Sequence, residues 1–331
     1  STPLYSSAAS DVYKRQCVDK VTGRAIYAND VQLQGLVEAA ILRSPEAHAR
    51  ILSIDTSEAE AHPGVLAVTT SADFPDLGDK VANLGEGPVN LAHLAANCLA
   101  KDKVLYKGHA VAAVAAQNVH IAREALDLIK VEYEPLPVIT DTLEAMKDGA
   151  QLLHDDQHTA YLGELSEKPS NVAAHLFFEK GDVEQGFKES EIVVEREFRT
   201  ETVHQGYIEP HNSTAFWNAD GQLTIWCSTQ GSFMIRNSVS DVLRLPVSQV
   251  KVVPTEIGGG FGGKITAYLE SVAAVLSKKS SQPVKLLMTR SEVFEASGPA
   301  PGSWMKVKMG ASKDGRITAA HVILAFEAGA Y

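Results

Sequence analysis

Apolar residues in this chain occur mainly as short runs, and most of the runs are bounded by glycine, proline or asparagine. Such runs are typical of β-strands. They predict strands over residues 36–42, 65–69, 109–116, 131–137, 191–199, 213–217, 223–228, 249–254, 283–288 and 304–309. Another strand-like run begins at His321, and the chain ends soon after it, at Tyr331.

Amphipathic spacing predicts a smaller number of helices. Asn118 is a typical capping residue, and the apolar residues after it share one face of a helix over residues 119–129. Further helices are predicted over residues 56–61, 233–243 and 265–276. Segments 74–100 and 141–170 are rich in turn residues and predict long loops, the second of which marks a domain boundary. The pattern as a whole indicates an α+β protein.

Length and composition describe a globular chain with about two domains. Of its 331 residues, 45% are hydrophobic and 21% are charged, which excludes a disordered or fibrous protein. The net charge of −11 argues against nucleic acid or an anionic membrane surface as a partner. No apolar run approaches the ~18 residues of a membrane span.

The cysteines and the chain ends add three expectations. Cys17, Cys98 and Cys227 are far apart and indicate neither a disulfide framework nor a metal cluster, which suits the cytoplasm. Residues 1–16 are polar, lack the apolar centre of a secretory signal, and are interpreted as a non-native leader. The strand-like run before Tyr331 indicates a fragment of a longer protein.

The glycine-rich segment Gly258–Lys264 stands out, because it joins a predicted strand to a predicted helix. Glycines let backbone N–H groups approach an anionic ligand closely. Gly258, Gly260 and Gly263 fit a dinucleotide pattern, and the final Gly-Lys fits the start of a phosphate loop. However, Ile265 replaces the Ser or Thr of a phosphate loop, and no acidic residue follows at the dinucleotide spacing. A tight turn without a ligand remains the alternative.

Several further motifs occur in an order that resembles the xanthine dehydrogenase and aldehyde oxidase family, the molybdenum hydroxylases. In the first half they are KVTGRAIY at 20–27, RSPEAHARILSIDT at 43–56, PGV at 63–65, KGHAVA at 107–112 and VEYEPLP at 131–137. In the second half they are KGDVE at 180–184, IEPH at 208–211, STQ at 228–230 and GGGFGGK at 258–264.

This resemblance implies a domain organisation. An a/b hammerhead domain is expected over residues 17–142, and a linker over residues 143–170. The first part of a mixed α/β molybdopterin-binding domain follows over residues 171–331, truncated at its end. The leader, residues 1–16, lies outside both domains.

The resemblance also implies site residues. Gln230 matches the glutamine that hydrogen-bonds an oxo ligand of molybdenum, and Gly260, Phe261 and Gly262 match the loop beside the metal and the pterin. Phe261 and Ile265 are candidates for the substrate pocket. Purine-oxidising members have a glutamate in place of Ile265 and an arginine within the segment matching 298–304, which has none here. A purine substrate is therefore disfavoured.

The implied cofactor is molybdenum–molybdopterin in its cytosine dinucleotide form. The family's catalytic glutamate lies beyond Tyr331, so no catalytic residue and no direct metal ligand is assigned, and the isolated chain is expected to be inactive. Electrons would pass to [2Fe-2S] clusters and FAD on an iron–sulfur small subunit and a FAD-binding medium subunit, in a dimer of heterotrimers. The substrate would be an aldehyde, an N-heterocycle or carbon monoxide.

Two other functions remain as alternatives. One is a degenerate scaffold without cofactor, which Ile265 favours and Gln230 opposes; the other is a nucleotide-binding protein. Three residues invite functional interpretation but are expected to be structural. Glu209 and His211 lack a third partner for metal binding, and His109 opens a buried strand.

Overall fold

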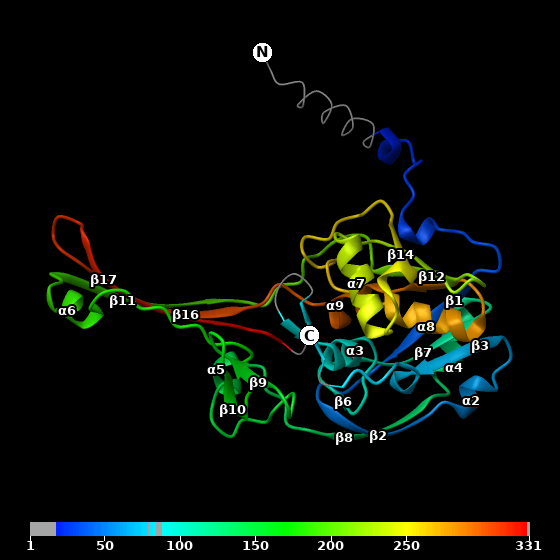
Figure 1. Ribbon diagram of the computed structural model, residues 1–331, viewed down its shortest axis with the longest axis horizontal. Coiled ribbons are helices and arrows are strands. Elements are labelled where there is room, and N and C mark those ends of the chain that lie inside the picture. The colour runs from blue at the N-terminus through cyan, green and yellow to red at the C-terminus, as the bar shows by residue number, and fades with distance from the viewer. Residues whose placement is uncertain (1–17, 79, 84–87, 330–331) are drawn as a thin grey trace, which may run out of the picture.

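The computed structural model describes residues 18–78, 80–83 and 88–329, so the predicted leader lies outside the described residues. A mixed sheet of seven strands runs through the larger body in Figure 1. In spatial order its strands are β14 (Val250–Pro254), β13 (Leu223–Cys227), β12 (Asn212–Trp217), β15 (Val284–Leu287), β1 (Val37–Arg43), β7 (Ala110–Ala116) and β3 (Val65–Thr70).

Strands from both halves of the sequence pair within this sheet. β1 runs parallel to β15, and β13 runs parallel to β14, whereas the other neighbours are antiparallel. β1, β3 and β7 precede the predicted linker, and β12 to β15 follow it. The sheet thus crosses the predicted boundary, and the division at residues 143–170 stays a prediction.

Helices cover both faces of the sheet. α7 (Ser232–Val242) and α8 (Glu270–Ser280) pack on one face, and α2 (Ser57–Glu60) and α4 (Val119–Leu126) pack on the other. Strand β7 is buried along its whole length because its alternate residues enter the two cores. Trp217 Nε1 donates a hydrogen bond of 2.8 Å to the Ala274 carbonyl and fixes α8 against β12.

Smaller elements surround this body. They are the sheet of β6 (Lys103–Val104), β2 (Ala49–Asp55) and β8 (Lys130–Pro135), the pairs β4 (Val81–Asn83) with β5 (Pro88–Asn90) and β9 (His158–Ala160) with β10 (Leu165–Pro169), and the 3-10 turns η1 (Ala28–Asp30), η2 (Ser71–Asp73) and η3 (Val247–Gln249). The remaining helices are α3 (Leu91–Cys98), α5 (Thr142–Ala145), α6 (Val183–Lys188) and α9 (Arg290–Ala296).

A second three-stranded sheet forms an arm that extends away from the body, with α6 at its far end (Figure 1). Its strands are β11 (Ile192–Thr200), β16 (Ser303–Ala311) and β17 (Ile317–Phe326), all antiparallel. The register puts Phe198, Met305 and Leu324 side by side on one face, and charged pairs such as Glu195 with Lys308 on the other.

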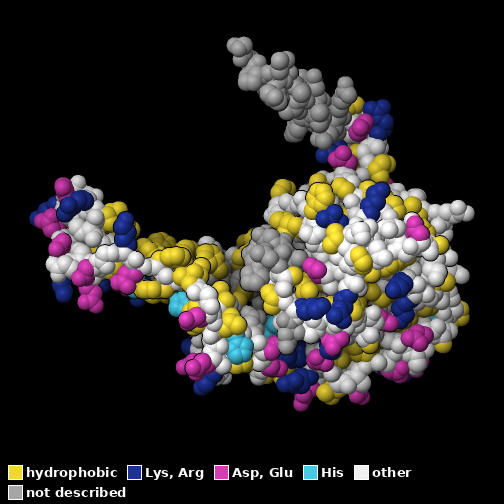
Figure 2. All heavy atoms as spheres, in the orientation of Figure 1, with side chains coloured by type: hydrophobic (Ala, Val, Ile, Leu, Met, Phe, Trp, Pro, Cys, Tyr) yellow, Lys and Arg dark blue, Asp and Glu magenta, His cyan; other side chains and the backbone are white. Residues whose placement is uncertain are grey.

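The first of these faces is called the apolar arm face. Its apolar members are Ile192, Val194, Phe198, Met305, Val307, Met309, Val322 and Leu324, and Arg196 also lies on it. Figure 2 shows hydrophobic side chains gathered along the arm. Phe198 and Leu324 are 52% and 54% exposed, whereas the charged face is partly covered by α6.

The predicted strands are confirmed within a few residues, and three other expectations are wrong. Segment 141–170 is not only loop, because it contains α5 and the paired strands β9 and β10. Segment 74–100 is not only loop, because Asn90 caps α3 by accepting a 2.8 Å bond from the Ala92 N–H, and an apolar face then packs inward. The predicted helix at 265–276 begins later, at Glu270. Its carboxylate accepts the N–H groups of Tyr268 and Leu269 at 3.0 and 3.1 Å, so these two residues are held ahead of α8 and not within it.

Candidate functional site

The glycine loop, residues 258–264, meets the segment Ser228–Gln230 at one edge of the large sheet. The loop follows β14, and Ser228–Gln230 follows β13. Because these two strands are parallel neighbours, their carboxyl ends lie together. This pairing brings Gln230 beside residues that lie about thirty positions later in the chain.

Gln230 is bonded to the loop through its side-chain oxygen. Oε1 accepts hydrogen bonds from the backbone N–H of Gly262 at 2.9 Å and of Lys264 at 3.2 Å. The Gln230 N–H donates to the Lys264 carbonyl at 2.9 Å. With its oxygen held in this way, the amide nitrogen Nε2 points elsewhere and has no partner among the described residues.

Gly260 must be glycine for this contact. A Cβ at Gly260 would lie 2.5 Å from Gln230 Oε1 and 2.8 Å from its Cδ, well inside van der Waals contact. The N–H groups of Gly259, Gly260 and Phe261 make no hydrogen bond within the described part of the chain. Together with Gln230 Nε2 they form a group of unused donors, which suits oxygen atoms of an anionic or oxo-bearing ligand.

Phe261 stands at the tip of the loop. It is 74% exposed, and its φ of 51° lies in the left-handed region that few side chains adopt. Such a conformation persists only where the surroundings hold it, and it is frequent at ligand sites. Phe261 is therefore not part of the core formed by the described residues.

The structure also places the other predicted pocket residues. Ile265 is half-buried immediately after the loop. Segment 298–304 lies close by, since Gln205 Nε2 donates to the Gly298 carbonyl at 3.0 Å and Gln205 Oε1 would be 3.0 Å from a Cβ at Gly263. The four predicted cofactor residues and the two predicted pocket positions are thus neighbours, although their roles remain predictions.

The position of the Lys264 side chain rules out the interpretation of residues 258–264 as a phosphate loop. Its side chain is completely buried and points away from the loop surface, to a 2.9 Å ion pair with Glu209. Burial lowers the pKa of Lys264, and the Glu209 carboxylate opposes that shift. An ammonium group held inside the protein does not reach a phosphate above the loop. The Glu209–Lys264 ion pair was not predicted, because nothing in the sequence links this lysine to a glutamate 55 residues earlier.

Buried histidines lie next to this pair and elsewhere in the core. His211 Nε2 bonds the Tyr207 hydroxyl at 2.8 Å, and burial, with Lys264 nearby, lowers the pKa of His211 to about 3. His109 accepts from the Leu105 N–H and contacts the Ala96 carbonyl at 2.8 Å, and burial lowers its pKa to about 4. The prediction of a core histidine at 109 is confirmed.

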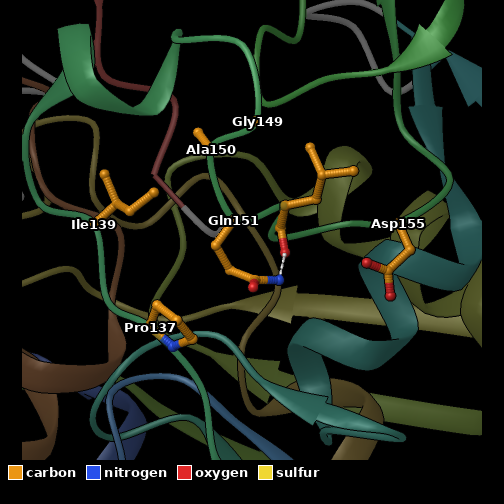
Figure 3. A pocket seen from close by; sticks show the side chains of 7 residues that line it. Pro137, Ile139, Gly149, Ala150, Gln151 and Asp155 are labelled. Carbon is orange, nitrogen blue, oxygen red and sulfur yellow. Dashed lines mark hydrogen bonds between the residues drawn. The ribbon is translucent and has the colours of Figure 1, made fainter.

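Three other observations concern metal sites, membrane spans and pockets. In the residues that the structure describes, no three His, Cys, Asp or Glu side chains are grouped as a metal site requires. None of the described helices combines the length and apolar character that a membrane span needs. An open pocket of about 510 Å³ lies in the predicted linker region (Figure 3), and no residue of the glycine loop lines it. Its lining residues are Pro137, Ile139, Gly149, Ala150, Gln151, Leu152 and Asp155.

Comparison with known families gives two matches that together cover most of the chain. Residues 22–137 match the a/b hammerhead domain of aldehyde oxidase and xanthine dehydrogenase. Residues 165–331 match the molybdopterin cofactor-binding domain. These matches, with the solved structure below, confirm the predicted fold class.

Individual relatives agree. The nicotinate dehydrogenase large molybdopterin subunit of Eubacterium barkeri is 33% identical over 99% of this chain and 72% of its own length. A probable xanthine dehydrogenase subunit of Bacillus subtilis is 33% identical over 94% of this chain, which spans only 39% of that relative. Reconstituted CO dehydrogenase from Oligotropha carboxidovorans superposes with a TM-score of 0.79 at 34% identity, over 93% of this chain and 38% of that one. The chain therefore belongs to the xanthine dehydrogenase and aldehyde oxidase family of molybdopterin-binding large subunits.

Proposed function

We propose that this chain forms one wall of the cofactor site in the large subunit of a molybdenum hydroxylase. The observation that carries the proposal is the group of unused donors at the glycine loop: Gln230 Nε2 and the N–H groups of Gly259, Gly260 and Phe261. The Gln230 oxygen is bonded to the loop, so its nitrogen is the atom that remains for a ligand. Because two loop N–H groups hold the Gln230 oxygen, its amide is fixed before a ligand binds, which lowers the cost of reorganisation.

These residues fit the group that the family implies. Molybdopterin carries phosphate and its metal carries oxo oxygens, and both accept hydrogen bonds from such donors. Glycine at position 260 allows Gln230 to keep this orientation, because the Cβ of any other residue would displace the Gln230 side chain. When bound, the cofactor supplies a two-electron oxidation that hydroxylates the substrate with oxygen from water. The chain's own residues would bind and orient it, while Phe261 covers the adjacent surface.

We extend the proposal to the finer assignments. The cofactor is the cytosine dinucleotide form, and iron–sulfur and FAD-binding subunits accept the electrons within a cytoplasmic dimer of heterotrimers. The substrate is an aldehyde, an N-heterocycle or carbon monoxide. Ile265 has no hydrogen-bonding group and segment 298–304 has no arginine, so a purine ring would lose polar contacts there. The family's catalytic glutamate is expected in sequence that this chain does not contain.

A chimera tests the proposal in a complete subunit. Residues 19–331 would replace the matching segment of the Bacillus subtilis relative, and the complex would be purified with its partner subunits. Molybdenum is measured by mass spectrometry, and cytidine monophosphate by chromatography after acid hydrolysis. We expect both at close to one per large subunit, with severalfold less in the Gln230→Leu chimera.

The control is the chimera carrying Gln222→Leu, which changes the same residue type in an exposed hairpin turn. A chimera that folds and assembles but contains no molybdenum would refute the proposal and favour the degenerate scaffold. Stoichiometric molybdenum without the nucleotide would refute only the cytosine dinucleotide form.

A further inference from the structure

A buried ion pair lies beneath the glycine loop, between the Glu209 carboxylate and the Lys264 ammonium group. Lys264 Nζ is 2.9 Å from Glu209 Oε2 and 2.9 Å from Ser228 Oγ. The ring of Tyr207 lies 5.0 Å from Nζ. A buried ammonium group is stable only where such partners replace water, so they hold the side chain in one orientation.

The same carboxylate oxygen binds the other end of the loop. Glu209 Oε2 accepts a 2.7 Å hydrogen bond from the N–H of Gly258, and the Glu209 N–H donates to the Gly258 carbonyl at 3.2 Å. A Cβ at Gly258 would be only 2.5 Å from Glu209 Cβ, so this approach requires glycine. One oxygen atom therefore joins Gly258, where the loop begins, to Lys264, where it ends.

The segment Ser228–Gln230 bonds to this closed loop at every residue. Ser228 Oγ donates to Glu209 Oε2 at 2.5 Å. Thr229 Oγ1 donates to the Lys264 carbonyl at 3.1 Å, and Gln230 Oε1 accepts from the Lys264 N–H. The position of the Lys264 main chain therefore determines where the Gln230 side chain lies.

We propose that Glu209 and Lys264 are positioning residues, and that their ion pair is a clasp that sets the shape of the glycine loop. Acting through the Lys264 main chain, the clasp directs the amide nitrogen of Gln230 toward the ligand side. The structural role expected for Glu209 is thus to hold the glycine loop in shape. The clasp itself concerns this chain alone, and only its effect on cofactor binding rests on the proposed function.

Hydrogen exchange of the 331-residue chain, measured by NMR, tests the clasp without any cofactor. In Glu209→Gln, the Gln230-bound N–H of Gly262 should exchange at least tenfold faster, although Gly262 does not touch Glu209. The double variant Glu209→Gln/Lys264→Met removes the unpaired buried charge. There we expect the urea midpoint to recover toward wild type while exchange at Gly262 stays fast.

The matched control is Glu195→Gln, which breaks an exposed ion pair with Lys306 and should change neither quantity. If exchange at Gly262 recovers together with the urea midpoint in the double variant, the pair only stabilises the fold and the proposal is wrong. If Glu209→Gln alone does not fold, the double variant, which leaves no buried charge unpaired, is compared directly with wild type. Wild-type exchange at Gly262 in the double variant would also overturn the proposal.

The chimera gives an independent second readout. Glu209→Gln should lower its molybdenum content at least threefold, whereas Glu195→Gln should leave it unchanged. Absence of molybdenum from the unmutated chimera would refute the proposed function but leave the exchange results, and hence the clasp, intact.

Discussion

Gly260→Ala is the smallest change that separates Gln230 from the glycine loop. The backbone at Gly260 is outside the left-handed region, so alanine is compatible with it. The added Cβ would lie 2.5 Å from Gln230 Oε1 and 3.0 Å from its Cγ, so the side chain must move. That movement breaks the bonds from Oε1 to the N–H groups of Gly262 and Lys264.

The magnitude follows from those two hydrogen bonds. Each contributes about 0.5–1 kcal/mol net at a partly exposed position, so losing both costs about 1–2 kcal/mol. Alanine restricts the unfolded chain and returns about 0.4–1 kcal/mol. The net destabilisation should be about 1 kcal/mol, measured by urea unfolding, with the N–H of Gly262 losing protection from exchange.

Gly231→Ala is the matched control, because it adds the same methyl group beside Gln230. Its Cβ would meet only the flexible thioether of Met234, at 3.3 Å, and its φ is −146°. Because Gly231 is the N-cap of α7, alanine there should cost up to about 1 kcal/mol, but the N–H of Gly262 should keep its protection from exchange. If Gly260→Ala also kept Gly262 protected, the loop contact would not hold Gln230.

Three further predictions concern other parts of the chain. Burial lowers the pKa of His211 to about 3 and that of His109 to about 4, so both are neutral when folded but bind a proton below about pH 6.5 when unfolded. Together they should lower the free energy of unfolding by about 2–3 kcal/mol from pH 7.5 to 5.5, and equal urea midpoints at the two pH values would contradict this. Arg43→Met, which breaks a largely buried pair with Glu292, should cost about 1–3 kcal/mol in urea unfolding, against under about 0.5 for Arg50→Met at an exposed pair. Leu324→Lys on the apolar arm face should reduce self-association in sedimentation at high concentration, whereas Ile323→Lys on the charged face should not.

Local patterns in the sequence predicted most strands but not their partners. Short apolar runs located β11 and β16, and the turn residues around β7 bounded a buried run. No local sequence pattern indicated the parallel pairing of β1 with β15, because Val37 and Val284 are far apart in the sequence and become neighbours only in the assembled sheet. Glycine and asparagine obscured α3, whose apolar face and Asn90 cap were present in the sequence.

The candidate site was predicted by motif resemblance and not by periodicity. Gln230 and Phe261 lie together as the resemblance implied, and the parallel strands before them explain why. The direction of Lys264 could not be predicted, since a lysine after a glycine loop suits either a phosphate or a buried carboxylate. Only the position of Glu209, more than fifty residues earlier, decides between them.

The pairing of β1 with β15 has a consequence for how this protein is made. After Arg43 leaves the ribosome, about 240 more residues must be synthesised before Val284 appears. At ~5–20 residues per second, this wait lasts roughly 12–50 s. During that time one edge of β1 has no neighbour, and an unpaired strand edge is open to aggregation. The yield of this chain should therefore depend on translation speed and on chaperone supply while that edge is unpaired.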